Sequence, residues 1–174
     1  MQKFQPRLFP FMGLFTAVTI LLTYVFSIQT TFLRLSFGFL PIALFSVLFG
    51  PIPAGIMAAA ADLIGTAFLG LGVFFPGFLL TDFLYGVIFG CFLYRKPITV
   101  KRAFIPFILI ALFLNLGLNT LWLTLFYGKA WEVFFYGRLL KNILWVPFQV
   151  LIFCAVCRAA LPAAQRILPG FRRS

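Results

Sequence analysis

The chain has 174 residues, of which 63% are hydrophobic and 20% are aromatic, and only 10% are charged. So few polar side chains leave hardly any surface for contact with water, which excludes a soluble globular protein. The formal net charge of +11 at pH 7 needs no nucleic acid as a partner, because basic loops that set membrane topology explain it. The sequence predicts an integral membrane protein in which residues 1–174 form a single domain.

Successive apolar runs, separated by short polar breaks, approach the roughly 17 to 25 residues that a helix needs to cross a bilayer. The first run begins after Lys3 and Arg7, as a signal peptide would, but no small-residue cleavage pattern follows Ile28, so we keep it in the mature protein. The second is short for a full crossing and is expected to be tilted or extended backwards through 33–36. We expect an all-α membrane protein with six transmembrane helices, at residues 8–28, 37–49, 54–69, 77–94, 103–126 and 139–161.

A tight turn is predicted between the second and third of these helices, at Gly50-Pro51-Ile52-Pro53. The two prolines remove backbone donors and fix φ, so one helix must end here and another must begin. The third helix carries one carboxylate, Asp62, in apolar surroundings. An acidic side chain in such a place suggests a function.

Basic residues are distributed unevenly between the two ends of the predicted bundle. Ten of the 14 lysines and arginines lie in the two terminal segments and in the loop at 95–102. The positive-inside rule places this side of the bundle in the cytoplasm. Both termini are therefore expected to be cytoplasmic, in a multi-pass protein of the cell membrane.

Polar side chains recur at helical spacing in the outer halves of the fifth and sixth helices. Asn115, Asn119 and Trp122 are separated by four and three residues, which places them on one face. Interhelical hydrogen bonds would explain the asparagines, and an interfacial aromatic belt would explain the tryptophans. For the whole set we favour a ligand site, because amides, indoles and cations share one stripe. The set in the sixth helix, also on one face, consists of Arg138, Lys141, Trp145 and Gln149.

The same outer side carries Arg34 and the glycine- and phenylalanine-rich segment 70–78, which could fold over a site as a lid. Asp62 and Asp82 offer acceptors for a ring with N–H donors, the cations offer partners for carboxylates, and the tryptophans offer flat surfaces for stacking. Together these residues predict a site for a flat, hydrogen-bonding aromatic molecule with an anionic end. Either acid could instead pack helices, and Asp82 could cap a helix that starts late.

Small residues at a spacing of four let helix backbones approach closely. Ala61 with Gly65, and Gly86 with Gly90, are expected to pack within the bundle. In the first helix, the pair Gly13 and Ala17 lies toward the cytoplasmic end, where a partner subunit could dock.

We expect no metal site, no cofactor and no enzymatic activity. Cys91, Cys154 and Cys157 lie within or near helix ends, where a thiol usually acts as a small hydrophobe, and the chain has no histidine to complete a metal site. An intramembrane hydrolase would need a nucleophile and a base. The chain has no obvious serine–base pair, although a carboxylate pair of Asp62 and Asp82 stays open.

Several short motifs in a fixed order resemble one family. RLSFGFLP at 34–41 is followed by FGP at 49–51 with Asp62 downstream, and FPGF at 75–78 opens a helix that contains Gly86 and Gly90. The sequence RLLK at 138–141, followed by Pro147, closes the series. Over nearly its whole length the chain is similar to the folate-family substrate-binding components of energy-coupling-factor vitamin transporters.

This resemblance implies a six-helix protein of the prokaryotic plasma membrane that captures folate or a reduced folate outside the cell. It also implies docking on a transmembrane coupling protein with two ATPases, which deliver the energy; the chain itself has no phosphate-binding G-x-x-x-x-G-K-[ST] loop. In the wider superfamily a small-x-x-x-small motif in the first helix contacts the coupling protein, and Gly13 and Ala17 match it. The pterin would stack on tryptophan, and the glutamate tail would meet cations near the mouth of the site: Arg34, Arg138 or Lys141.

Three alternatives stay open at this point. The nearest is a component of the same superfamily for riboflavin, pantothenate or a queuosine precursor, although a ligand without a carboxylate would leave the three cations underused. The second is the six-helix hydrolase. The third is a purely structural subunit, which would bind no small molecule.

Overall fold

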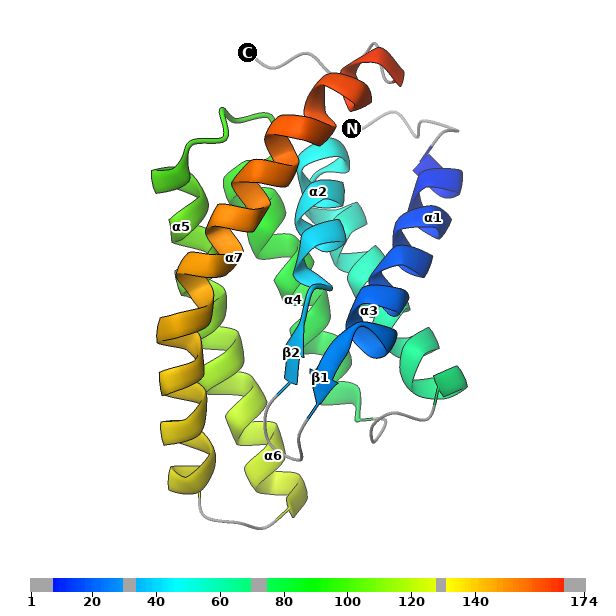
Figure 1. Ribbon diagram of the computed structural model, residues 1–174. Helices are drawn as coiled ribbons and strands as arrows, with labels where there is room; N and C mark the ends of the chain where they lie inside the picture. The colour runs from blue at the N-terminus through cyan, green and yellow to red at the C-terminus, as the bar shows by residue number, and fades with distance from the viewer. Residues whose placement is uncertain (1–7, 30–33, 70–74, 128–130, 168–174) are drawn as a thin grey trace.

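The computed structural model describes residues 8–29, 34–69, 75–127 and 131–167. Its helices form one bundle in which α1 begins and α7 ends at the same end (Figure 1), as an even number of crossings requires. The elements in chain order are α1 (Leu8–Ile20), η1 (Leu21–Val25), β1 (Ser27–Gln29), β2 (Arg34–Ser36), α2 (Phe39–Phe49), α3 (Pro51–Leu69), α4 (Pro76–Leu93), α5 (Val100–Leu109), η2 (Ile110–Leu118), α6 (Asn119–Tyr127) and α7 (Trp131–Ile167).

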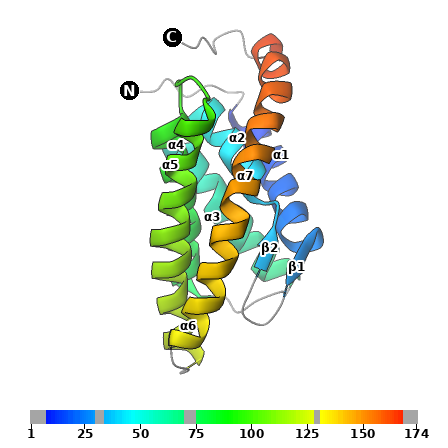
Figure 2. The same ribbon diagram turned by 60° about the vertical axis from the view of Figure 1, so that its left-hand side comes forward.

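The six predicted membrane segments are confirmed. Within the described residues, 5 helical segments are long and apolar enough to cross a membrane, and α2 is a shorter apolar helix. The fifth crossing consists of α5, the π-helix η2 and α6, which follow one another without a break beside α7 (Figure 2). Pro106 inside α5 removes a backbone donor shortly before the π-helix begins.

Two details of the first two helices differ from the prediction. The first helix ends at Val25 instead of Ile28, and of the two options for the short second helix the backward extension is wrong, because 34–36 form a strand. Instead, Ser27–Gln29 pairs with Arg34–Ser36 as a two-stranded antiparallel hairpin. The ladder between the strands pairs the backbone N–H and C=O groups of these residues where the helix has ended.

Four other helices begin earlier than predicted, the fourth at Pro76 instead of residue 77 and the fifth at Val100 instead of residue 103. The third starts at Pro51 instead of residue 54, because proline fits the first turn of a helix, where its missing N–H is not needed. The sixth starts at Trp131 instead of residue 139, so α7 has 37 residues.

The predicted turn between α2 and α3 is confirmed, and it is a single residue long. Gly50 adopts φ 94° and ψ −176°, and its N–H donates to the Ser46 carbonyl at 3.0 Å. A residue with a side chain rarely adopts this φ, so glycine is required at this position. Pro51 follows directly as the first residue of α3.

Helices α3 and α4 approach each other closely enough for backbone contact. A Cβ atom at Gly86 would collide with the backbone of Ala54, and one at Gly90 would collide with Pro51. Aromatic rings fill the core beside this pair: Phe89 packs on Phe107 with ring centroids 4.9 Å apart. The predicted packing role of Gly86 and Gly90 is therefore confirmed.

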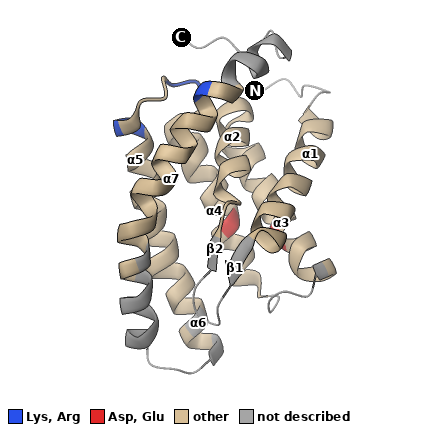
Figure 3. Ribbon diagram, viewed as in Figure 1, with Lys and Arg blue, Asp and Glu red and all other residues tan. Residues whose placement is uncertain are grey.

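The described basic side chains gather at the end where α1 begins and α7 ends (Figure 3). They lie on α5, on the α4–α5 loop and near the end of α7, whereas the described acidic residues lie on α3 and α4, away from this end. The basic residues expected at the other end, Arg34, Lys129, Arg138 and Lys141, lie outside the described side chains, so the expected cytoplasmic location of this end rests on the count over the full sequence. The basic residues whose side chains are described are Arg95, Lys96, Lys101, Arg102 and Arg158.

Candidate functional site

The β1–β2 hairpin marks the outer half of the bundle as the place for a site. Helix α2 has only 11 residues, so it reaches only part of the way along the bundle from the end that holds the termini. The two strands lie beyond it, beside the other half of the bundle, and α6 extends further still (Figures 1 and 2). Open sheet edges do not occur in contact with lipid hydrocarbon, so the hairpin must face protein or water. This is the environment expected around a ligand site that opens to the outside.

The predicted polar face of the fifth crossing forms around the π-helix η2. Asn119 Nδ2 donates to Asn115 Oδ1 at 3.4 Å, so these two amides lie together as their spacing predicted. The Thr120 hydroxyl donates to the Asn115 carbonyl at 3.2 Å, five residues back along the chain. Short π-helical segments are frequent at functional sites, and this one carries Asn115.

Trp122, the third residue of this face, lies against the beginning of α4. Its Nε1 donates to Thr81 Oγ1 at 3.3 Å, and its ring centroid is 5.4 Å from that of Phe75. A Cβ atom at Gly77 would lie 2.7 Å from the indole ring. Trp122 therefore joins α6 to α4 and to the end of the predicted lid; residues 70–74 of that lid lie outside the described part of the chain.

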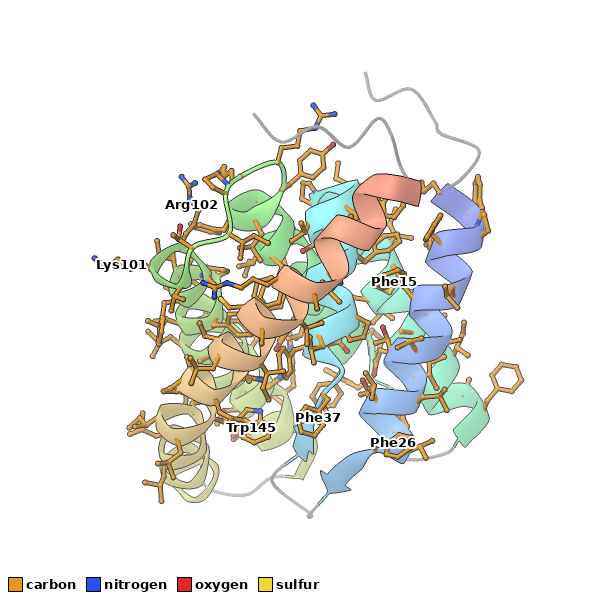
Figure 4. All side chains as sticks on the ribbon, turned by 45° about the horizontal axis from the view of Figure 1, so that its top comes forward. Phe15, Phe26, Phe37, Lys101, Arg102 and Trp145 are labelled. Atoms are coloured by element: carbon orange, nitrogen blue, oxygen red, sulfur yellow. The ribbon has the colours of Figure 1, made fainter. Side chains whose placement is uncertain are left out.

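Trp145 on α7 lies against the segment that links the hairpin to α2. Its ring centroid is 5.9 Å from that of Phe37 and 5.1 Å from that of Phe148. Figure 4 shows Phe37 and Trp145 side by side, well away from Lys101 and Arg102. Gln149, one turn further along α7, is half-buried. The tryptophans of the two predicted faces therefore pack against different parts of the bundle. Trp122 contacts α4, and Trp145 contacts the segment that follows the hairpin.

The two acidic residues have different surroundings. Asp62 accepts a hydrogen bond from the Tyr24 hydroxyl at 2.8 Å through Oδ1, which joins α3 to the end of η1. Asp82 is half-buried on α4 and lies six residues after its first residue, Pro76. A cap position for Asp82 is therefore ruled out, because the helix begins well before it.

The predicted cations at the mouth of the site lie where the structure describes the backbone only. Arg34 is the first residue of β2, and both Arg138 and Lys141 belong to α7. Their side chains lie outside the described part of the structure. Their role in ligand binding stays a prediction.

Sequence analysis did not single out three polar residues that the structure places at these junctions. Tyr24 is 5% exposed and meets Asp62, Thr81 is 2% exposed and meets Trp122, and Asn142 is 7% exposed. Asn142 Nδ2 donates to the Ala111 carbonyl in η2 at 3.1 Å, which joins α7 to the π-helix. The sequence shows each of these residues as a polar side chain within an apolar helix, which could have marked it as a candidate. It does not show which residue each one contacts, because that depends on the tertiary fold.

The predicted docking pair lies on an open surface. Gly13 and Ala17 are both exposed on α1, and a Cβ atom at Gly13 would meet no atom within 4 Å. Large apolar side chains are exposed around the pair, including Phe9, Leu14 and Val18. Of the side chains that the structure describes, no three histidine, cysteine or acidic residues form a metal cluster.

Known proteins resemble this chain over most of its length. A family model described as "ECF transporter, substrate-specific component" matches residues 11–157. The folate transporter FolT of Clostridium novyi (strain NT) is 38% identical over 142 residues, which cover 82% of this chain and 83% of that protein. The folate transporter FolT of Leuconostoc mesenteroides is 29% identical over 154 residues, covering 85% and 83% of the two chains.

A solved structure agrees with these sequence matches. The crystal structure of FolT bound with folic acid superposes with a TM-score of 0.83 at 35% identity, and the match covers 87% of this chain and 93% of that chain. The family match and the likeness to a solved FolT structure both indicate a transporter component and not an intramembrane hydrolase. The chain belongs to the family of substrate-specific components of energy-coupling-factor transporters.

Proposed function

We propose that this protein captures folate or a reduced folate outside the cell as the substrate-binding subunit of an ATP-driven importer. The observation that carries the proposal is the likeness, at 35% identity and a TM-score of 0.83, to a FolT structure with folic acid bound. The curated relative at 38% identity is also a folate transporter.

The chemistry of the outer half supports an aromatic, anionic ligand. Trp122 and Trp145 offer ring surfaces for a pterin, and Asn115, Asn119 and Gln149 offer amide donors and acceptors for its edge. The glutamate tail of folate carries two carboxylates. Charge-assisted bonds to such groups are the strong ones, and the proposed donors for them are Arg34, Arg138 and Lys141.

Delivery into the cell requires partners. The protein would dock through the α1 surface around Gly13 and Ala17 on a transmembrane coupling protein that carries two ATPases. The open space over Gly13 supports this surface, because a partner helix could approach the α1 backbone there.

The direct test is a titration of the detergent-purified protein with folic acid, followed by tryptophan fluorescence, with riboflavin and pantothenate as controls. Saturable quenching at nanomolar folic acid, with no response to the controls, would support folate as the substrate. A folded protein that responds to riboflavin or pantothenate and not to folic acid would overturn the choice of vitamin. Binding of none of the three would overturn folate as the substrate and leave a component for another ligand, such as a queuosine precursor, or a structural subunit.

A further inference from the structure

Trp122 is held from three sides by residues at the start of α4. Its indole N–H meets Thr81, its ring lies over the backbone of Gly77, and Phe75 packs on it. Gly77 and Thr81 are four residues apart in α4 (Pro76–Leu93), so both belong to one face of the helix. Because these contacts come from a buried glycine and a buried threonine, they fix the orientation of the ring as well as its position.

The hydrogen bonds form a directed chain. An indole can only donate, and a hydroxyl has a single proton to give. The Thr81 hydroxyl gives its proton to the Gly77 carbonyl at 2.9 Å, which leaves its oxygen to accept from Trp122 Nε1 at 3.3 Å. At 2% exposure Thr81 is buried, so both bonds of its hydroxyl lie inside the protein.

The chain has a consequence for recognition. The indole N–H is used within the protein, so Trp122 can offer a ligand only the surface of its ring. Gly77 covers part of that surface, since a Cβ atom there would lie 2.7 Å from the indole. Only the remaining part of the ring can meet a flat ligand, and the orientation of that part depends on Thr81.

We propose that Thr81 is a positioning residue for ligand binding, which fixes Trp122 so that the free part of its indole stacks on the pterin. This inference rests on the proposed function for the identity of the ligand. The arrangement of Trp122, Thr81, Gly77 and Phe75 does not depend on it.

The test is a double-mutant cycle in the full-length protein. Thr81→Val keeps the shape of the side chain and removes the hydroxyl, whereas Trp122→Phe keeps an aromatic ring and removes the N–H. Folic acid affinity, measured by calorimetry, should fall about tenfold in Thr81→Val, and Thr81→Ser should retain most of it because the hydroxyl is kept. In the Trp122→Phe background, Thr81→Val should cause no further loss. If the fold-loss in affinity of the double variant equals the product of the two single losses, the proposal is overturned, because Thr81 would then act independently of Trp122.

Thr19 supplies a matched control. Its hydroxyl donates to the Phe15 carbonyl four residues back at 2.7 Å, and the residue is 3% exposed, so Thr19→Val removes a similar bond on α1. Thr19→Val should leave folic acid affinity unchanged. Equal losses in Thr19→Val and Thr81→Val would indicate a general loss of stability and would overturn the positioning role.

A second measurement does not depend on the vitamin. Time-resolved fluorescence anisotropy of the ligand-free protein should show greater indole mobility in Thr81→Val than in the wild type, and this difference should vanish in the Trp122→Phe background. If Thr81→Val does not fold, Thr81→Ala replaces it in both experiments. Failure of the wild type to bind folic acid would overturn the proposed function alone, whereas an unchanged anisotropy would overturn the inference alone.

Discussion

The Tyr24 hydroxyl donates to Asp62 Oδ1 at 2.8 Å and so fixes the point where the first crossing ends. The Tyr24 ring also lies against Gly65, where a Cβ atom would collide with it. Two residues further, Phe26 closes η1 by donating its N–H to the Leu21 carbonyl at 2.9 Å, and β1 starts at Ser27. The start of the hairpin is therefore tied to α3 through one side-chain pair.

Removing this hydroxyl should loosen the hairpin. Leaving a buried polar group without its hydrogen-bond partner costs about 1–3 kcal/mol, so we expect Tyr24→Phe to lower the thermal unfolding midpoint in detergent. Amide hydrogen exchange at Ser27–Gln29 should become faster as well. Tyr94→Phe, at the opposite end of the bundle, is the control. Unchanged exchange in Tyr24→Phe would show that the hairpin is held by other contacts.

Adding one methyl group at Gly86 should destabilise the bundle. A Cβ atom there would meet the backbone of Ala54, which cannot move aside as a flexible side chain could. Overpacking of this kind costs about 1–3 kcal/mol. Thermal unfolding of Gly86→Ala should therefore shift downward, whereas Gly13→Ala, with no atom within 4 Å of the new Cβ, should unfold as the wild type does or later. Equal midpoints would mean that α3 and α4 can separate at little cost.

Replacing Arg138 and Lys141 together by alanine should weaken folic acid binding at least about tenfold, since each charge-assisted bond contributes roughly 1.5 to 3 kcal/mol. Calorimetry or fluorescence titration measures the change. The double variant Lys101→Ala/Arg102→Ala removes the same number of charges at the cytoplasmic end and should bind normally. Unaltered affinity in the Arg138/Lys141 variant would assign the glutamate tail to other residues.

Bulky side chains on α1 should abolish transport and leave ligand binding intact. Gly13→Leu and Ala17→Leu should abolish uptake and complex formation with the coupling protein, and folic acid affinity in detergent should stay intact, because both residues are exposed. Ala155→Leu, exposed on α7, should affect neither property. Complex formation by the α1 variants at the normal level would place the docking surface elsewhere.

The sequence predicted the features that depend on short stretches of chain. The number of crossings follows from the lengths of apolar runs, and the turn at Gly50 follows from the prolines beside it. The pairing of Asn115 with Asn119 follows from helical spacing. Each of these depends on residues within a few positions of each other.

The features that were not predicted depend on residues far apart in the chain. Tyr24 and Asp62 are separated by 38 positions, and Trp122 and Thr81 by 41. The hairpin is an exception, because its strands at 27–29 and 34–36 are close in the chain; it was missed because the end of the first apolar run and the residues before the second were expected to be helical. Helical spacing also gives no sign of η2, because a π-helix uses the same residue types as an α-helix.

The short helix α2 has a consequence for how the chain is threaded through the membrane. Its 11 residues rise only about 16 Å, roughly half of a bilayer core of about 30 Å. The extended residues of β2 before it advance about 3.3 Å each, so the second crossing is completed by a strand and a helix in series. A count restricted to full-length helices gives 5 crossings and would put the two ends of the chain on opposite sides. The second crossing, which consists of a short strand and a short helix, brings the count to six and returns the carboxyl end to the side from which the chain entered.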